Sequence, residues 1–204
     1  MAEPEQPGKA LVLASGNAGK LRELAAILVP LGWKVSGESD WGVTGAVEDG
    51  LSFIENALIK ARHASKNTGL PALGDDSGLV VDALNGAPGI YSARCAGADA
   101  DDQANNLKLL RKLNGVPPEG RTAHFYCAMA LVRHPDDPSP LLATGAWHGV
   151  ITDTPAGVGG FGYDPLFWIP NEGCTSAELT AEKKNRLSHR GRALAQMLEQ
   201  LAEF

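Results

Sequence analysis

Residues 121–151, RTAHFYCAMALVRHPDDPSPLLATGAWHGVI, decide the fold class. Two long runs, 121–134 and 141–151, are rich in apolar, aromatic and β-branched residues, and the Pro- and Asp-rich segment PDDPSP separates them. This pattern predicts two long strands joined by a turn. Strands joined so closely run antiparallel. The sheet of this protein is therefore expected to contain a central antiparallel pair.

Helices and strands alternate before that pair. Residues 9–15 form a short apolar run that predicts a buried strand, and a helical spacing of leucines follows from Lys20. A second strand is expected at 33–39. Ser52, followed three positions later by Glu55, has the spacing of a capping box, which predicts a helix that begins there and ends at a glycine.

Three further patterns complete the secondary structure. Two strand-like runs, 70–74 and 79–84, flank the polar string DDSG, for which a hairpin turn is the ordinary interpretation. The segment 100–115 predicts a helix, in which Leu107, Leu110 and Leu113 would form the apolar stripe. A last helix is predicted from Ser188 to the C-terminus. Together with the long strands, this order predicts an α/β fold with a mixed sheet and no internal repeats.

Composition restricts the class of protein. The 204 residues are 44% hydrophobic, enough for a sizeable core. We expect one domain over 9–204 after a frayed lead-in, 1–8. The formal net charge of −6 argues against a nucleic-acid or acidic membrane surface. No apolar run is long enough to span a membrane. The sequence therefore predicts no nucleic-acid partner and no membrane partner. The spacing of the three cysteines (Cys95, Cys127 and Cys174) suggests neither disulfides nor a zinc site. A protein of this kind is expected in the cytoplasm.

The segment LVLASGNAGKLREL, 11–24, has the outline of a phosphate-binding loop. A P-loop requires four residues between its glycines and a Ser or Thr directly after the lysine. Here only two residues separate Gly16 from Gly19, and Leu21 follows Lys20. Without a P-loop, the segment still predicts a strand that leads into a helix N-terminus and carries one lysine. On these residues alone, an ordinary turn is slightly favoured over a phosphate site.

Acidic residues gather in two places. In GDDSGL, Asp75 and Asp76 are adjacent, so in an extended segment they point to opposite faces and at most one is expected to act as a metal ligand or base. Glu48 and Asp49 precede the capped helix, in which Glu55 has a capping role. Carboxylates from separate loops are what Mg²⁺ requires, because this hard ion prefers oxygen ligands.

Basic and aromatic residues form two further candidates. The segment 180–194 carries six cations or histidines, of which His189 and Arg190 fall in the first turn of the predicted C-terminal helix, where the helix dipole disfavours positive charge. This cluster of cations could bind an anionic ligand or form a solvated charged surface, and the two explanations are about equally good. The glycine-rich segment 155–167 offers Phe161 and Tyr163 for stacking on a base, although a bulged connection would look the same.

Six segments in this order, SGNAGKLREL, FIENALIKA, GDDSGLVVDAL, GAPGIYSAR, GGFGYDPLF and SHRGRAL, resemble the inosine/xanthosine triphosphate pyrophosphatases. The resemblance covers about Leu11 to Leu201. It implies an elongated mixed β-sheet with flanking helices that form two lobes around a deep cleft. It also implies a homodimer, a divalent metal (usually Mg²⁺), and hydrolysis of ITP, dITP and XTP to monophosphate plus pyrophosphate.

The resemblance also implies roles for individual residues. Asp76 corresponds to the catalytic aspartate and would share the metal with Glu48, while Val47 stands where some members carry a further acid. The triphosphate would be held by the first motif, that is, by Ser15, Gly16, Asn17, Ala18, Gly19 and Lys20. The remaining substrate contacts would come from Ser77, Phe161, Gly162, Tyr163, Asp164, Lys184, His189 and Arg190.

Base choice has a physical requirement of its own. Hypoxanthine and xanthine carry a carbonyl where adenine carries an amino group, so a guanidinium such as that of Arg190, which has donors only, would accept the first two and reject adenine. A regulator that binds nucleotides without hydrolysis, a nucleic-acid-binding protein and a pyrimidine nucleotide phosphohydrolase are the alternatives.

Overall fold

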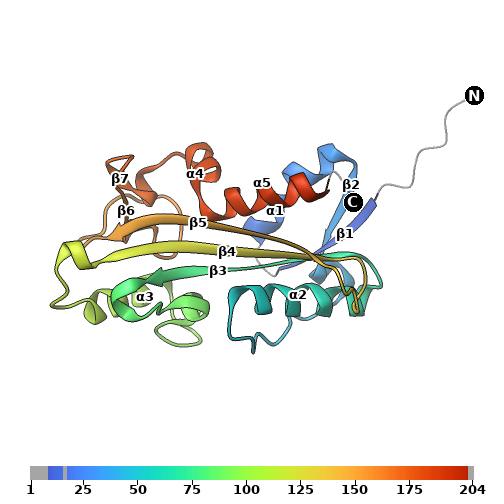
Figure 1. Ribbon diagram of the computed structural model, residues 1–204, viewed down its shortest axis with the longest axis horizontal. Coiled ribbons are helices and arrows are strands. Elements are labelled where there is room, and N and C mark those ends of the chain that lie inside the picture. Colours follow the sequence, from blue (N-terminus) through green and yellow to red (C-terminus); the bar gives the residue numbers. More distant parts are fainter. Residues whose placement is uncertain (1–8, 16–17, 202–204) are drawn as a thin grey trace, which may run out of the picture. The chain divides into compact units, whose positions relative to one another are not determined.

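The computed structural model describes residues 9–15 and 18–201, and they form one mixed sheet with helices packed on it (Figure 1). The strands in the order β2-β1-β3-β4-β5-β6-β7 make up the sheet. Their bounds are β1 Lys9–Ala14, β2 Trp33–Gly37, β3 Ala72–Val81, β4 Thr122–Val132, β5 Leu141–Ile151, β6 Phe167–Ile169 and β7 Cys174–Thr175. The α-helices are α1 Ala18–Leu28, α2 Phe53–Thr68, α3 Asp102–Lys112, α4 Ala181–Leu187 and α5 His189–Leu201.

The sheet contains both strand directions. β1 pairs in parallel with β2 and with β3, whereas β6 pairs antiparallel with β5 and with β7. The neighbours β4 and β5 are joined by residues 133–140, too short a connection for a parallel crossover. The mixed-sheet α/β class and the long central strands predicted from 121–151 are confirmed.

The chain divides into two compact units. The first consists of residues 1–76 and 129–142, and the second of residues 77–128 and 143–204. Strands β3, β4 and β5 contribute residues to both units. The single domain over 9–204 and the cleft between two lobes stay predictions.

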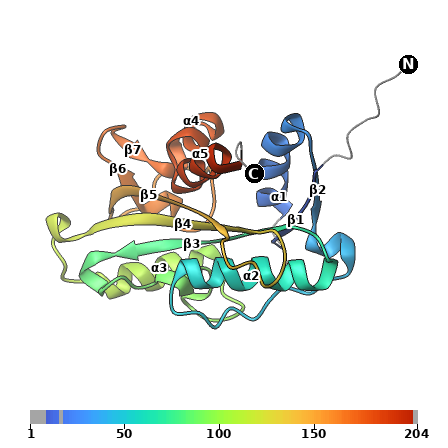
Figure 2. The same cartoon turned by 45° about the vertical axis from the view of Figure 1, so that its right-hand side comes forward.

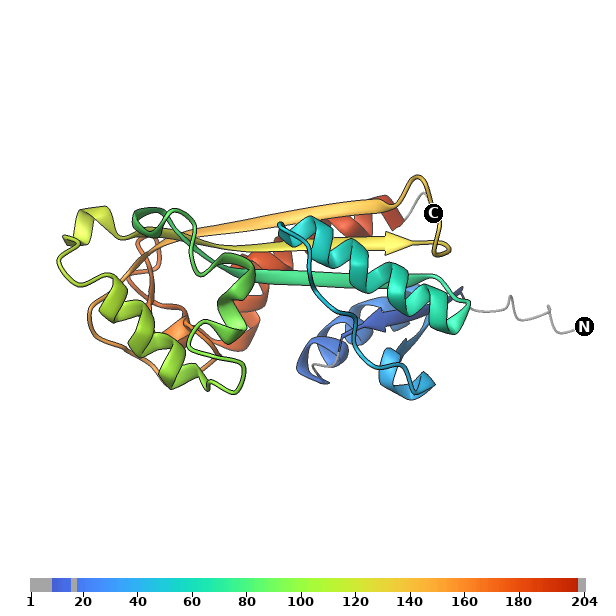
Figure 3. The ribbon, with the colours of Figure 1, turned by 90° about the horizontal axis from the view of Figure 1, so that it is seen from below.

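In the first unit, the parallel strands β2, β1 and β3 carry helices on both faces. The crossover through α1 leads from β1 to β2 on one side, and the crossover through α2 leads to β3 on the other side of β1. Because such crossovers are right-handed, the two helices must cover opposite faces, as Figure 2 shows. α2 lies directly on β3 (Figure 3), since a Cβ at Gly74 would overlap the carbonyl oxygen of Ala57.

In the second unit, α5 lies on the sheet and supplies much of the buried surface. Ser188 caps this helix, because its hydroxyl accepts a hydrogen bond from the backbone N–H of Gly191 at 3.2 Å. The predicted C-terminal helix is confirmed, and its buried residues include Leu194, Met197 and Leu201. The core of this unit also includes large side chains from β4, β5 and β6, among them Phe125, Trp147 and Phe167.

Two predictions differ from the structure, and one helix was not predicted. The polar string DDSG is not a hairpin turn, because β3 runs without interruption from Ala72 to Val81. In α3, Leu107 is exposed, and Leu109 is buried in its place with Leu113, one helical turn later. The helix α4, capped by the hydroxyl of Thr180, was not predicted, because its sequence AEKKNRL has few apolar residues to mark a buried face.

Within 9–15 and 18–201, no helix combines the length and the apolar character needed to cross a membrane.

Candidate active site

In the first unit, polar groups gather where β1 and β2 end beside the middle of β3. β1 ends at Ala14, which pairs with Gly74 of β3, and Ser15 follows at that edge. Asp76 lies two residues farther along β3. β2 ends beside β1 and is followed by Glu38, whose side chain is buried. Loops at this edge of parallel strands are where α/β folds commonly bind ligands.

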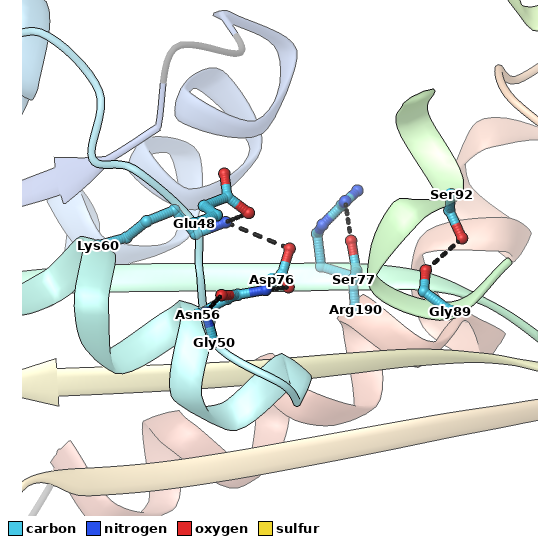
Figure 4. A network of polar contacts seen from close by, with 9 residues as sticks. All are labelled: Glu48, Gly50, Asn56, Lys60, Asp76, Ser77, Gly89, Ser92 and Arg190. Carbon is cyan, nitrogen blue, oxygen red and sulfur yellow. Dashed lines mark hydrogen bonds and ion pairs between the residues drawn. The ribbon is translucent and has the colours of Figure 1, made fainter. Parts of the chain in front are cut away.

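Asp76 is the centre of a polar network (Figure 4). The amide nitrogen of Asn56 donates a hydrogen bond to Asp76 Oδ2 at 3.2 Å, and Lys60 Nζ lies 3.3 Å from Asp76 Oδ1. Lys60 Nζ also forms an ion pair with Glu48 Oε2 at 3.4 Å. Asn56 further accepts a hydrogen bond from the backbone N–H of Gly50 at 3.0 Å, which fixes the loop that carries Glu48. One ammonium thus holds two carboxylates close together.

Burial favours the protonated form of two acids here, Asp76 and Glu38. Burial raises the pKa of Asp76, while the positive charge of Lys60 and the hydrogen bond from Asn56 oppose this effect and Glu48 adds to it. The pKa of Glu38 is also raised, mainly by burial, against the opposing charges of His63 and Lys60. A buried carboxylate with a raised pKa is a frequent feature of catalytic sites.

The donor set suits a hard divalent cation. Within the part of the chain that the structure describes, no group of three or more His, Cys, Asp or Glu side chains could hold a metal alone. Mg²⁺, however, is commonly bound by one or two carboxylates together with substrate phosphates and water. Glu48 and Asp76 supply two such oxygen ligands on either side of Lys60. The residues present therefore fit Mg²⁺ as a partner of a bound phosphate.

The first motif is described only in part. Ser15 lies at the end of β1, and its backbone N–H donates a hydrogen bond to the carbonyl of Leu13 at 3.0 Å. Ala18, Gly19 and Lys20 open α1, so the predicted arrangement of a strand followed by a helix N-terminus is confirmed. Gly16 and Asn17 lie outside the described residues, as do the side chains of Ala18 and Lys20.

In the second unit, an exposed aromatic ring is covered by two cations. Phe161 is 55% exposed, a large fraction for a phenyl ring. Lys184 Nζ lies 4.8 Å from the centre of this ring, and the guanidinium carbon of Arg190 lies 5.9 Å from it. Arg190 also contacts Ser77, with 3.5 Å between Nη2 and Oγ (Figure 4). Four predicted substrate contacts are thus brought together.

Asp164 and Tyr163 fix the loop that carries Phe161. The buried Asp164 carboxylate accepts hydrogen bonds from the Phe161 backbone N–H and from Ser176 Oγ, both at 2.8 Å, and forms an ion pair with Lys184. The Tyr163 hydroxyl donates to the carbonyl of Ser92 at 2.9 Å, and burial raises the pKa of this phenol. Their direct contact with a nucleoside stays a prediction.

The six basic residues of 183–192 do not form one anion site. The buried His189 ring stacks on Phe125, with ring centres 4.9 Å apart. Lys183 pairs with Glu172, and Arg192 donates to the carbonyl of Ala146 at 2.7 Å. His189, Lys183 and Arg192 thus have partners within the protein, and an anionic ligand for the segment stays a prediction.

Sequence reasoning missed Asn56 and Lys60, the two residues that bind Asp76. The signal was present, since they lie four residues apart on the capped helix and so share one face. A buried asparagine on that face, next to buried Ala57 and Ala61, marks a position where a polar partner is required. Glu38 was missed as well, and nothing in its local sequence distinguishes it from a surface residue.

Comparisons with known proteins agree with this geometry. Residues 11–200 match the Ham1 family. A dITP/XTP pyrophosphatase of Shigella flexneri is 59% identical over 94% of this chain and 97% of its own, and one of Escherichia coli strain K12 is 56% identical over the same shares. The structure of a HAM1 protein from Coxiella burnetii has a TM-score of 0.92 at 46% identity and covers 96% of this chain and 99% of that chain. The family resemblance predicted from six sequence segments is confirmed: the chain belongs to the Ham1 family.

Proposed function

We propose that this protein hydrolyses aberrant purine nucleoside triphosphates, namely ITP, dITP and XTP, to the monophosphate and pyrophosphate, and so removes them from the nucleotide pool. The observation that carries the proposal is the network in which Lys60 holds Asp76, in the middle of β3, close to Glu48, in the loop before α2. Relatives at 56–59% identity that carry the name dITP/XTP pyrophosphatase support the choice of substrate.

The reaction transfers the α-phosphoryl group to water. The oxygen of water attacks the α-phosphorus, the bond from that phosphorus to the oxygen bridging the α- and β-phosphates breaks, and pyrophosphate leaves with the bridging oxygen. In this proposal Asp76 would accept the proton of the attacking water; the contacts of its carboxylate with Asn56 and Lys60 and the rise of its pKa on burial support that role. A general base works best when its pKa is close to the ambient pH.

Charge neutralisation is the second requirement. Glu48 and Asp76 would hold Mg²⁺, which when bound neutralises the charge that develops on the leaving pyrophosphate. Lys60 keeps the two carboxylates together before the substrate arrives, because its ammonium offsets their mutual repulsion. The first motif, with Ser15, Lys20 and the backbone N–H groups that open α1, would hold the triphosphate.

In this proposal, residues of the second unit would recognise the base. The exposed ring of Phe161 is a surface on which a purine can stack. Arg190, which reaches Ser77 from α5, offers guanidinium donors that match a 6-carbonyl and oppose the 6-amino group of adenine. Lys184 adds a positive charge beside the same ring. From the family resemblance we further propose a homodimer that acts in the cytoplasm.

Steady-state pyrophosphate release tests the proposal. ITP, XTP, dITP, ATP and GTP are compared in the presence of Mg²⁺ and after its removal by a chelator. We expect kcat/KM for ITP and XTP to exceed that for ATP by roughly 100-fold or more, because a buried donor left facing a donor is strongly disfavoured. Equal turnover of ATP and ITP would refute the base selection, and undiminished turnover in chelator would refute the metal requirement.

A further inference from the structure

Both backbone polar groups of Gly162 are held by one face of α3. The carboxylate of Asp102 accepts a hydrogen bond from the Gly162 backbone N–H, with 2.6 Å between Oδ2 and N. The amide nitrogen of Asn106 donates a hydrogen bond to the Gly162 carbonyl oxygen at 2.8 Å. Asp102 and Asn106 are four residues apart, so they lie on the same face of the helix. One turn of α3 thus binds both the N–H and the carbonyl oxygen of Gly162.

The position that α3 holds has an unusual backbone conformation. Gly162 has a φ of 62°, in the left-handed region where other residues are strained. Because glycine has no side chain to restrict its backbone, the loop needs contacts with other parts of the protein to keep this conformation. The contacts from Asp102 and Asn106 supply this restraint. The Asp102 bond is the stronger of the two, since hydrogen bonds to a charged acceptor exceed neutral ones.

Phe161 precedes Gly162 directly, so the direction of its ring depends on this peptide. On the other side, the Phe161 backbone N–H is fixed by Asp164, and the next residue, Tyr163, is anchored in the core through its hydroxyl. Phe161 as a whole stays 55% exposed, and Lys184 and Arg190 lie over its ring. Backbone restraint with an exposed aromatic ring is the arrangement of a preorganised stacking surface.

We infer that Asp102 and Asn106 are positioning residues that set base recognition by holding Gly162, and through it the ring of Phe161, in the substrate-stacking position. This inference rests on the proposed function, which gives Phe161 a purine to bind. The two residues do not touch the reacting phosphates in this account. Their loss therefore weakens binding of the base and leaves the chemical step intact.

Asp102→Ala removes the acceptor for the Gly162 N–H, and Asp102→Asn restores one, because the amide oxygen of asparagine can accept the same bond. Asp101→Ala is the matched control. Asp101 is the adjacent residue and caps α3 by accepting a hydrogen bond from the Ala104 N–H at 2.7 Å, without a contact to Gly162. The substitution Asp101→Ala therefore weakens the same helix, α3, and leaves the hydrogen bond between Asp102 and Gly162 in place.

The first measurement is amide hydrogen exchange of residues 160–164 in the free protein. We expect Asp102→Ala to exchange these amides at least about tenfold faster than wild type, while Asp102→Asn and Asp101→Ala stay near wild type. Because this measurement needs no substrate, it tests the restraint even if the proposed activity is wrong. Unchanged exchange in Asp102→Ala, or equal acceleration in Asp101→Ala, would overturn the inference.

The second measurement is the steady-state kinetics of ITP hydrolysis. We expect Asp102→Ala to raise KM about fivefold or more, in keeping with the loss of one base–aromatic stacking contact, with kcat within about twofold of wild type. Asp102→Asn should recover most of the affinity, and Asp101→Ala should keep the wild-type KM. A fall in kcat with an unchanged KM, or no rescue by Asp102→Asn, would overturn the assignment to base positioning.

Discussion

The polar network around Asp76 and the loop around Phe161 are built on opposite principles. In the first, the charged groups pair with one another: the single ammonium of Lys60 is shared by the carboxylates of Asp76 and Glu48, so one negative charge is left over when both are ionised. In the second, an apolar ring is left 55% exposed and cations lie over it. Under the proposed function, this difference corresponds to a division of roles, in which the paired charges act on the phosphates and the exposed, rigidly held ring recognises the base.

Asp76→Asn should produce the largest effect. We expect kcat for ITP to fall by at least about 100-fold, because the variant cannot accept a proton and is a poorer metal ligand. Pyrophosphate release under saturating ITP and Mg²⁺ measures this loss. Activity within tenfold of wild type would show that other residues serve as the general base and bind the metal.

The stability of the same variant provides the control and a pH test. Burial raises the pKa of Asp76 above its unfolded value, so its ionised form destabilises the native state, and the native state regains stability as the pH falls through the native pKa. In chelator at pH 7, Asp76→Asn should therefore have a higher free energy of unfolding than wild type, with a difference that shrinks in acid. Urea unfolding across pH measures it, and a variant that is less stable at pH 7 would contradict the burial argument.

A smaller effect is expected in the second region. Arg190→Ala should lower the ratio of kcat/KM for ITP over ATP by about tenfold or more, because the donors that oppose adenine are removed. The matched control is Arg192→Ala, whose guanidinium donates to Ala146 and has no contact with Phe161 in the described chain. If the ratio of kcat/KM for ITP over ATP changes equally in both variants, Arg190 does not recognise the base.

Much of the fold could be predicted from local pattern. The capped helix α2 and the strands β4 and β5 carry strong periodic and turn signals, and Ser52 indeed accepts a hydrogen bond from the Glu55 N–H. The hairpin prediction at DDSG failed because turn residues were weighed without their surroundings. There, α2 covers Gly74, and Asp76 finds Asn56 and Lys60 as partners, so a polar string can continue a buried strand.

The candidate site was predictable only in its parts. The family pattern predicts Asp76, Glu48, Phe161 and Arg190 as site residues, but their local sequences do not show which side chains meet. The contact between Lys60 and Asp76 depends on how α2 packs against β3, and the hold of α3 on Gly162 joins segments about sixty residues apart in sequence. Such long-range contacts follow from tertiary packing, which periodicity does not report.

The position of bond cleavage tests the central claim most directly. ITP is incubated with the protein and Mg²⁺, and phosphorus NMR follows the products as they form. We predict that IMP and pyrophosphate appear in equal amounts from the first time point, with no IDP. Formation of IDP and inorganic phosphate would place the attack at the γ-phosphorus and contradict the account of Asp76 and its network.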